Sequence, residues 1–314
     1  MRKVAVVTTG FFDGVHLGHR HVLSAVVSSA RERGEEAVVV TFWPHPRTVL
    51  QQDAREFRIL TSLEEKKALL AAAGIDRVEV LPFTRAFAAM TAEAYLQLLR
   101  DKYDASLVVM GYDNRIGSDR LTIDALTGAF ESRKPSLLRS SSLPTSLLAV
   151  GPLPFTWPRA AMVSGDPNAP VISSTKIRNA LQEGRVEEAN AMLGYRYGLY
   201  GAVVAGNQLG RTMGFPTANM QLYEPLKLVP ANGVYAVEAE VLGTTYKGMC
   251  NIGMRPTVGG ASRTIETHIL DFDEDIYGLP LKLRFVRRIR DERKFPSLEA
   301  LRKQLTLDAL NCKK

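Results

Sequence analysis

Short apolar runs alternate with longer amphipathic segments in the first part of the chain. The apolar runs predict buried strands. We expect these strands at residues 4–8, 37–42, 77–81 and 107–110. The amphipathic segments predict helices at residues 16–33, 63–73 and 91–102. Strands separated by helices are typical of a parallel, doubly wound α/β sheet, in which ligands bind beyond the carboxyl ends of the strands.

Branched and aromatic residues dominate from about residue 195 onward, in short runs divided by glycine or proline. These runs predict strands at residues 200–204, 234–241, 245–252, 263–270 and 281–289. Short strands at this spacing favour a small closed antiparallel β-barrel. A terminal helix is expected at residues 297–310, with an apolar face that includes Leu298.

Residues 135–170, between these two parts, carry many serines and prolines, which predict irregular structure. Two short helices are expected after them, at residues 175–182 and 186–192. The chain of 314 residues is long enough for two ordinary domains. We therefore divide it into an α/β domain at 1–184 and a β-barrel domain at 185–314.

A net charge of +7 and a pI near 9.4 suit an anionic ligand such as ATP, and would also suit nucleic acid. The basic residues are spread along the sequence, however. Their densest cluster, at residues 284–290, partly alternates as in a strand with one charged face. This distribution argues against a nucleic-acid partner.

The two cysteines, Cys250 and Cys312, lie far apart in the sequence and are expected to be free thiols in a reducing compartment. No apolar stretch approaches the ~20 residues of a membrane span, and the first residues do not resemble a signal peptide. We therefore expect a cytoplasmic protein without a membrane partner.

One run closes the first expected strand and opens the first expected helix: Thr9-Gly10-Phe11-Phe12-Asp13-Gly14-Val15-His16-Leu17-Gly18-His19. Helix N-termini favour anions, and Gly18 allows a phosphate group to approach closely. The imidazoles of His16 and His19 can donate hydrogen bonds to phosphate oxygens. The run predicts a nucleotide-phosphate site. An ordinary strand-to-helix turn and a zinc pair are the alternatives, although only His21 offers a further nearby ligand.

The barrel part contains a second distinctive stretch, whose glycines are Gly206, Gly210 and Gly214. Thr217 and Asn219 follow two positions apart, so on an extended segment their side chains face the same way. Such neutral oxygen donors suit Mg²⁺, which keeps phosphate and water among its ligands. A glycine-rich hairpin followed by an asparagine turn is the alternative.

Glu266 lies between branched residues on an expected strand. An unpaired buried carboxylate is costly, so this side chain must face a ligand, a partner in the core, or solvent. The sequence alone leaves these alternatives open.

Several motifs together resemble the prokaryotic bifunctional riboflavin kinase/FAD synthetase family, and they cover most of the chain. The run from Thr9 to His19 is similar to its N-terminal signature, and Gly206 to Asn219 is similar to its kinase signature G-x-x-x-G-R-x-x-G-F-P-T-A-N. The other motifs follow in the family's order. They are Thr41-Phe42-Trp43-Pro44-His45-Pro46, Ile59-Leu60-Thr61-Ser62, Met110-Gly111-Tyr112-Asp113 and Ile172-Ser173-Ser174-Thr175-Lys176-Ile177-Arg178.

The resemblance implies two ATP-dependent reactions. The barrel would phosphorylate riboflavin to FMN, with Mg²⁺ held by Thr217 and Asn219 and with Glu266 as the base for the ribityl 5′-hydroxyl. A nucleotidyltransferase-like α/β domain would convert FMN to FAD and release pyrophosphate. The implied ligands are therefore ATP, riboflavin, FMN, FAD and pyrophosphate.

The resemblance also implies further site residues. The phosphate charge of adenylyl transfer would be met by His16, His19, Ser174, Thr175 and Arg178, although serines before a helix are also typical of an N-cap. Other residues that would bind nucleotide are Gly10, Phe12, Asp13, Gly14, Gly18 and Asp113. Those expected at the kinase loop and the flavin are Gly206, Gly210, Arg211, Gly214, Pro216, Arg290 and Phe295.

Two features depart from the family's pattern. Asn114 and Ile116 stand where the family usually has aromatic residues, so a stacking surface for the isoalloxazine ring would be lost. Residues 135–170 also lack the family's regular helix and strand. A kinase with an impaired adenylyltransferase half therefore remains an alternative, as do a non-catalytic flavin- or nucleotide-binding regulator and, on charge alone, an RNA-binding protein.

Overall fold

The computed structural model describes residues 3–50, 57–111, 115–121, 155–156, 172–206, 209–257 and 260–313. The chain divides by its contacts into two compact units, which we call the sheet unit (1–57 and 63–171) and the barrel unit (58–62 and 172–314). The helix expected at 175–182 thus folds with the barrel unit. The domain boundary expected after residue 184 stays a prediction.

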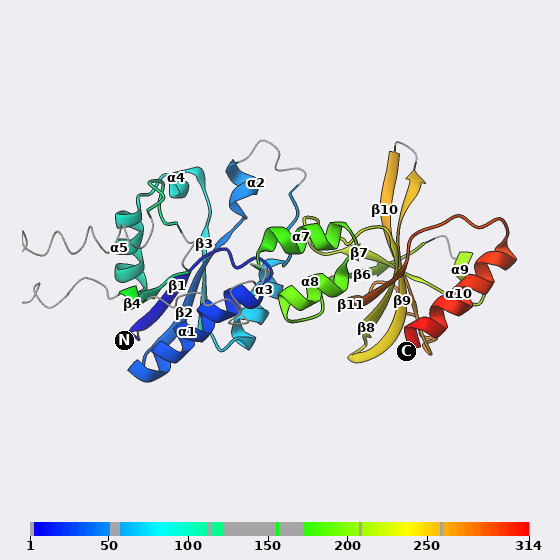
Figure 1. Ribbon diagram of the computed structural model, residues 1–314, viewed down its shortest axis with the longest axis horizontal. Helices are drawn as coiled ribbons and strands as arrows, with labels where there is room; N and C mark the ends of the chain where they lie inside the picture. The colour runs from blue at the N-terminus through cyan, green and yellow to red at the C-terminus, as the bar shows by residue number, and fades with distance from the viewer. Residues whose placement is uncertain are drawn as a thin grey trace, which may run out of the picture. The chain divides into compact units, whose positions relative to one another are not determined.

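The sheet unit is built on a parallel sheet with the strand order β3-β2-β1-β4-β5. Its strands are β1 (Ala5–Thr9), β2 (Glu36–Trp43), β3 (Arg77–Pro82), β4 (Ala105–Val109) and β5 (Phe155–Thr156). The order reverses between β1 and β4, and open sheets of this kind bind ligands at the carboxyl end of such a reversal. The predicted doubly wound sheet is confirmed (Figure 1).

Helices cover both faces of this sheet, because alternate residues of each strand point to opposite sides. Its helices are α1 (Leu17–Arg33), α2 (Pro46–Leu50), α3 (Leu63–Ala72), α4 (Arg85–Ala88) and α5 (Ala92–Tyr103). Val6 and Val39 belong to a core shared with α1 and α3, whereas Val7 and Val40 belong to a core shared with α5. The predicted N-cap of α5 is confirmed, since the Thr91 hydroxyl accepts a hydrogen bond from the Ala94 amide.

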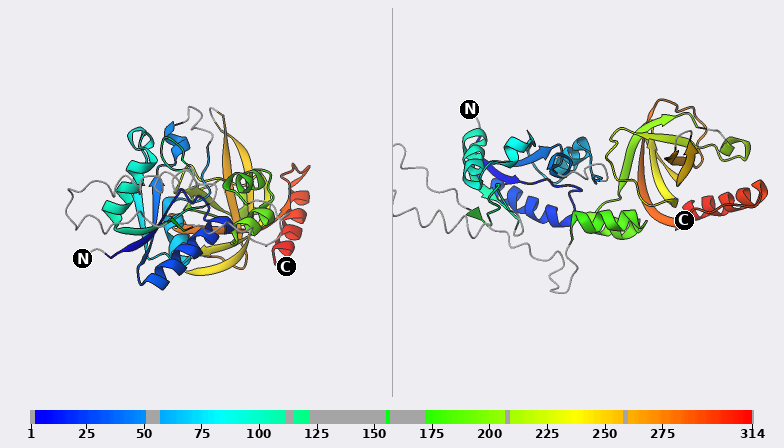
Figure 2. Two further views of the ribbon diagram at one scale, coloured as in Figure 1. Left: turned by 60° about the vertical axis from the view of Figure 1, so that its left-hand side comes forward. Right: turned by 90° about the horizontal axis from the view of Figure 1, so that it is seen from above.

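The barrel unit contains the predicted closed β-barrel, with the strand order β10-β7-β6-β11-β8-β9 (Figure 2). Its strands are β6 (Gly198–Val204), β7 (Ala218–Leu222), β8 (Gly233–Val241), β9 (Thr244–Thr257), β10 (Gly260–Ile269) and β11 (Pro280–Arg290). Its helices are α7 (Ser174–Gln182), α8 (Val186–Leu193), α9 (Leu209–Thr212) and α10 (Leu298–Lys313). The strand pattern did not predict β7, which is short and partly polar.

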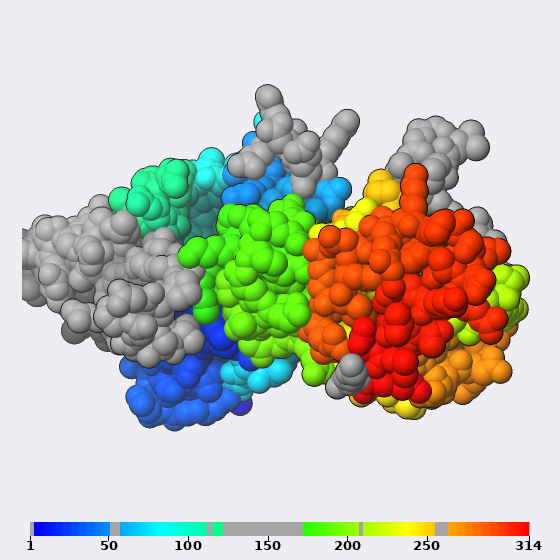
Figure 3. Space-filling view, turned by 45° about the vertical axis from the view of Figure 1, so that its right-hand side comes forward, coloured from blue at the N-terminus to red at the C-terminus, as the bar shows by residue number. Residues whose placement is uncertain are grey.

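Helix α10 lies along the outside of the barrel, where Figure 3 shows it in red. A fully buried carboxylate anchors it: Asp308 accepts a hydrogen bond from Gln304 at 2.7 Å and pairs with the Arg290 guanidinium at 2.8 Å. Leu298, expected on the buried face, is instead 72% exposed. The helix therefore packs through its C-terminal half and through one buried ion pair.

Both cysteines are free, as expected, and both are buried. No helix in the described part of the chain is both long and apolar enough to cross a membrane.

Candidate active sites

The turn after β1 is strained and buried. Phe12, Gly14 and Val15 all have positive φ angles, of 48°, 84° and 36°. A branched residue such as Val15 rarely adopts this conformation, so the surrounding packing must impose it. Phe12, Asp13 and Val15 are all buried, which supplies that packing. Strain of this kind is common where a turn is shaped for a ligand.

His16 and His19 form one stacked pair at the end of this turn. Their ring centroids lie 3.6 Å apart with an interplanar angle of 16°. His16 is the N-cap of α1, because its Nδ1 accepts a hydrogen bond from the His19 amide at 3.3 Å. An accepting Nδ1 places the ring proton of His16 on Nε2.

Burial lowers the pKa of His19 well below its usual value, and electrostatic interactions with His16 and Lys66 lower it further. The ring is therefore neutral at pH 7 and can donate one hydrogen bond. Its Nδ1 is buried and meets no hydrogen-bond partner among the described residues. A neutral imidazole beside a helix N-terminus is suited to bind a phosphate oxygen.

Gly10 and Gly18 stand on either side of this turn, and the close approach of phosphate predicted at Gly18 stays a prediction. A Cβ on Gly10 would come within 3.2 Å of the Phe12 ring, and Gly18 is the second residue of α1, where backbone N–H groups have no partner within the helix. Asp113 and Asn114, which follow β4, lie outside the described residues.

Aromatic rings gather where β1, β2 and β3 end. Phe11 lies 5.0 Å from Phe42 and 5.8 Å from Phe83, and Phe42 lies 5.2 Å from Phe87, between ring centroids. Phe11, Phe83 and Phe87 are only partly buried. We call these four residues the aromatic rim. Sequence reasoning missed it because its members come from separate segments, although three of them follow or end predicted strands.

Ser174, Thr175 and Arg178 belong to the barrel unit, whereas His16 and His19 belong to the sheet unit. Ser173 is the N-cap of α7, and its hydroxyl accepts from the Lys176 amide at 3.3 Å. Arg178 Nε donates to the Arg58 carbonyl at 2.9 Å. Their shared role with the histidines stays a prediction.

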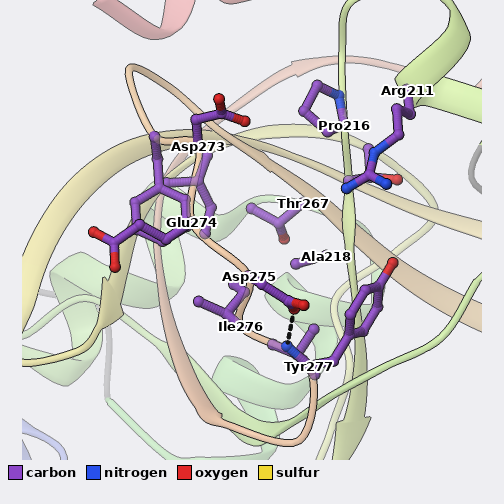
Figure 4. A pocket seen from close by; sticks show the side chains of 13 residues that line it. Arg211, Pro216, Ala218, Thr267, Asp273, Glu274, Asp275, Ile276 and Tyr277 are labelled. Atoms are coloured by element: carbon purple, nitrogen blue, oxygen red, sulfur yellow. Dashed lines mark hydrogen bonds between the residues drawn. The ribbon is translucent and has the colours of Figure 1, made fainter.

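Two cavities border the glycine-rich loop before β7 in the barrel unit, and Thr217 lines both. The larger has a volume of about 620 Å³ and includes Glu266 and Phe295. The smaller, of about 220 Å³, includes Arg211 and Thr267, and Figure 4 shows the Thr267 side chain between Arg211 and Asp273. Thr217 thus stands where ligands in the two cavities would meet.

Glu266 lies directly opposite Asn219 in the pairing of β10 with β7. Residues opposite each other across antiparallel strands present their side chains on the same face. The carboxylate of Glu266 and the side-chain amide of Asn219 therefore share one face of the barrel wall. Glu266 lines the larger cavity, whereas Asn219 is not among the lining residues of either cavity. The sequence left the side that Glu266 faces open, and the structure places it at a cavity.

The loop before β7 is held in place by contacts that sequence reasoning missed. The Pro216 carbonyl accepts a hydrogen bond from His268 Nδ1 at 2.8 Å. A Cβ on Gly206 would collide with the Asn219 amide, and one on Gly210 would collide with the Phe215 carbonyl. Gly214 has a φ of 83°, which favours glycine. These glycines set the shape of the loop.

For the kinase reaction that the sequence resemblance implies, replacing Gly206 with alanine is expected to slow FMN formation by about 10²-fold, because the side-chain amide of Asn219 must move. Steady-state kinetics with riboflavin and MgATP would measure the loss. Ala205→Ser, which adds atoms at the exposed neighbouring residue, should leave the rate unchanged. Equal kinetics for Gly206→Ala and the wild type would contradict the tight fit described here.

Arg290 and Phe295 both line the larger cavity, and their expected place beside the flavin stays a prediction. Arg290 is also the partner of Asp308, and its guanidinium lies 5.5 Å from the centroid of the Phe295 ring. Arg293 lies 4.7 Å from the same ring. The two guanidinium groups hold the Phe295 ring beside the cavity.

The chain is similar to known proteins over its whole length. The riboflavin kinase family model matches residues 193–314, and the FAD synthetase family model matches residues 1–134. The bifunctional riboflavin kinase/FMN adenylyltransferase of Bacillus subtilis is 33% identical over 308 residues, which cover 97% of this chain and 90% of the relative. The Escherichia coli K12 protein of the same name is 35% identical over 310 residues, covering 98% of this chain and 91% of the relative.

A solved structure shares the fold of the entire chain. It is titled a macrolide-efflux protein from Streptococcus pneumoniae, and it matches with a TM-score of 0.84 and 31% identity. The match covers 99% of this chain and 94% of that chain. Both units therefore have a counterpart in one solved structure.

Proposed function

The chain belongs to the bifunctional riboflavin kinase/FMN adenylyltransferase family, and we propose that its two units divide the two reactions between them. The protein phosphorylates riboflavin to FMN and adenylylates FMN to FAD. The resemblance recognised in the sequence is confirmed. The division is supported by the two family models, which match different units.

The barrel unit is the proposed kinase. The larger cavity would take riboflavin, and the smaller would take ATP, so that the γ-phosphate and the ribityl 5′-hydroxyl meet near Thr217. The hydroxyl oxygen attacks the γ-phosphorus, the bond to the bridging oxygen breaks, and ADP leaves. Glu266 takes the hydroxyl proton. The single observation that carries this assignment is that Glu266 faces the larger cavity opposite Asn219.

Mg²⁺ is the proposed metal of this reaction. The hydroxyl of Thr217, the amide oxygen of Asn219 and the nearby carboxylate of Glu266 are oxygen donors, which suit a hard cation. Mg²⁺ usually binds few protein ligands and keeps phosphate oxygens and water, so this set fits it. When bound, the ion would neutralise phosphate charge.

The sheet unit is the proposed adenylyltransferase. An FMN phosphate oxygen attacks the α-phosphorus of ATP, the bond to the bridging oxygen breaks, and pyrophosphate leaves. No protein nucleophile is required. The imidazoles of His16 and His19 and the N-terminus of α1 would donate hydrogen bonds to the phosphate oxygens.

The aromatic rim is the proposed contact surface for the isoalloxazine ring in the sheet unit. It offers three partly exposed phenylalanines at the carboxyl end of the sheet, the edge that carries the histidine pair. The rim would replace the aromatic residues that the family usually has at the positions of Asn114 and Ile116. Ile116 is buried, at 6% exposure, and packs in the core beside α5.

Two matched substitutions test which unit binds which flavin. Phe295→Leu is expected to weaken riboflavin binding about tenfold and to leave FMN adenylylation unchanged, because Phe295 lines only the barrel cavity. Phe83→Leu is expected to weaken FMN binding in the sheet unit about tenfold and to leave riboflavin phosphorylation unchanged. Flavin fluorescence titration of the full chain, followed by steady-state kinetics of each reaction, would measure both. Loss of the same reaction in both variants would overturn the assignment.

The second product of FAD formation and the cellular location of the protein are further proposals. Pyrophosphate is the proposed second product of FAD formation. The buried free thiols of Cys250 and Cys312 suit a reducing compartment, so the cytoplasm is the proposed location. We propose no nucleic-acid or membrane partner.

A further inference from the structure

Lys66 is the most deeply buried lysine side chain described in the sheet unit, with 3% exposure. It lies in the first turn of α3, beside Lys67, whose side chain is 40% exposed. Lysine is almost never fully buried without a partner. A buried ammonium group is costly unless an opposite charge or hydrogen-bond acceptors compensate it, so the partners of Lys66 must be identified.

The position of this ammonium group is set by the turn after β1. Lys66 Nζ donates to the Thr41 hydroxyl over a long 3.5 Å, and that hydroxyl donates to the Phe11 carbonyl at 3.4 Å. Nζ also lies 6.0 Å from the centroid of the Trp43 ring. The ammonium group is thus connected, through one hydroxyl, to the loop that carries His16.

Buried polar side chains of the sheet unit gather at the same carboxyl edge, where ligands bind in sheets of this kind. They are Thr8, Thr9, Asp13, His16, Thr41 and Lys66. Concentrations of buried polar groups mark functional sites, because an apolar core would be cheaper to fold.

The acidic group near Lys66 does not balance its charge. Burial lowers the pKa of Lys66 to about 8, and Asp13 only partly opposes this shift. The ammonium group in turn helps to lower the pKa of His19. Among the described residues, Asp13 in the turn and His19 on α1 are the titratable groups that interact electrostatically with Lys66, while Thr41 and Trp43 on β2 carry no charge. Within this described set, the one acidic partner only partly offsets the effect of burial on Lys66.

We propose that Lys66 supplies the buried positive charge of the adenylyl-transfer site, with the phosphates of ATP and the departing pyrophosphate as its counter-ion. This inference rests on the function proposed for the sheet unit. Lys66 moves no proton. Its charge stabilises the bridging oxygen and the pyrophosphate as they gain the electron pair of the broken bond. A low local dielectric makes one such charge effective.

Kinetics of three variants test this role. Lys66→Met is expected to lower kcat/KM for ATP in FAD formation about 30-fold and to weaken inhibition by pyrophosphate about tenfold. Lys66→Arg should keep most of the wild-type kcat/KM for ATP and most of the inhibition by pyrophosphate, because arginine keeps the positive charge. Lys67→Met, at the exposed neighbour, should match the wild type. Riboflavin phosphorylation by the same molecules, in the barrel unit, should be unchanged in all three.

The pH profile separates an electrostatic role from a structural one. In the wild type, kcat/KM for ATP in FAD formation should fall as the pH rises through about 8, because Lys66 loses its proton in the free enzyme. The His19 ring is already neutral at this pH, so its titration does not contribute to the fall in kcat/KM. In Lys66→Arg the fall should move to higher pH, since arginine stays charged. The comparison of the wild type with Lys66→Arg separates an electrostatic role of Lys66 from a structural one even if Lys66→Met does not fold.

The proposal fails if Lys66→Met keeps both kcat/KM for ATP and pyrophosphate inhibition within twofold of the wild type. It also fails if the wild type and Lys66→Arg share one pH profile. The function proposed for the sheet unit fails separately: in that case the wild type forms FAD, but His16 and His19 variants form it equally well.

Discussion

Replacing Glu266 with glutamine is expected to slow FMN formation from riboflavin by about 10³-fold, while FAD formation from supplied FMN continues at the wild-type rate. A positioned general base contributes on this order, and glutamine keeps the shape of the side chain but cannot take the proton. Glu266 faces the larger cavity of the barrel unit, opposite Asn219, and the second reaction is assigned to the other unit. Initial rates with each flavin and MgATP would measure the contrast.

The matched control for this variant is Glu240→Gln. Glu240 lies on β8 and pairs with Arg284, with a side chain that is 38% exposed and outside both cavities. Exposed ion pairs contribute little to stability, so both reactions should continue unchanged. A Glu266→Gln protein that still phosphorylates riboflavin within tenfold of the wild type would remove Glu266 from the role of base.

The converse result is expected for His19→Ala, which should slow FAD formation by about 10³-fold and leave FMN formation intact. The neutral ring is proposed to donate to phosphate oxygens, and loss of one preorganised donor typically costs 10² to 10³ in rate. The stacked partner His16 would also lose its ring contact at 3.6 Å, which adds to the loss. Rates of FAD formation from FMN and MgATP would measure it.

His21→Ala is the matched control, since His21 stands two residues further along the same helix. It should retain both reactions, because no part of the proposed mechanism uses it. FAD formation that survives His19→Ala but fails in His21→Ala would mean that the wrong face of α1 has been assigned to phosphate.

Much of this fold follows from local pattern, because hydrophobic periodicity and turn residues are local properties. The runs of valine gave β2 and β4, and the branched strands gave the barrel. Strand β7 was not predicted, since its residues are few and partly polar and its pairing with β6 and β10 supplies the order. Tertiary context decides such segments.

The sites divide in the same way. His16, His19, Thr217 and Asn219 could be proposed as site residues from the sequence because each stands in a compact motif with a chemical reason for its spacing, and their roles stay predictions. The burial of Lys66 could not be predicted, because the adjacent lysines of α3 look alike in the sequence and only packing distinguishes them.

Long-range contacts were equally invisible in the sequence. Arg290 was expected at the flavin, but its pairing with Asp308 depends on how α10 lies against the barrel. The aromatic rim unites rings from segments far apart along the chain, and no periodicity connects them.

The central claim is that FMN formation depends on Glu266 in the barrel unit and that FAD formation depends on the histidine pair in the sheet unit. The most direct test is chromatography of the products formed by Glu266→Gln and His19→Ala, each incubated with MgATP and either riboflavin or FMN. The account predicts that Glu266→Gln makes FAD from FMN but no FMN from riboflavin, and that His19→Ala makes FMN from riboflavin but no FAD. Equal loss of both products in both variants would contradict it.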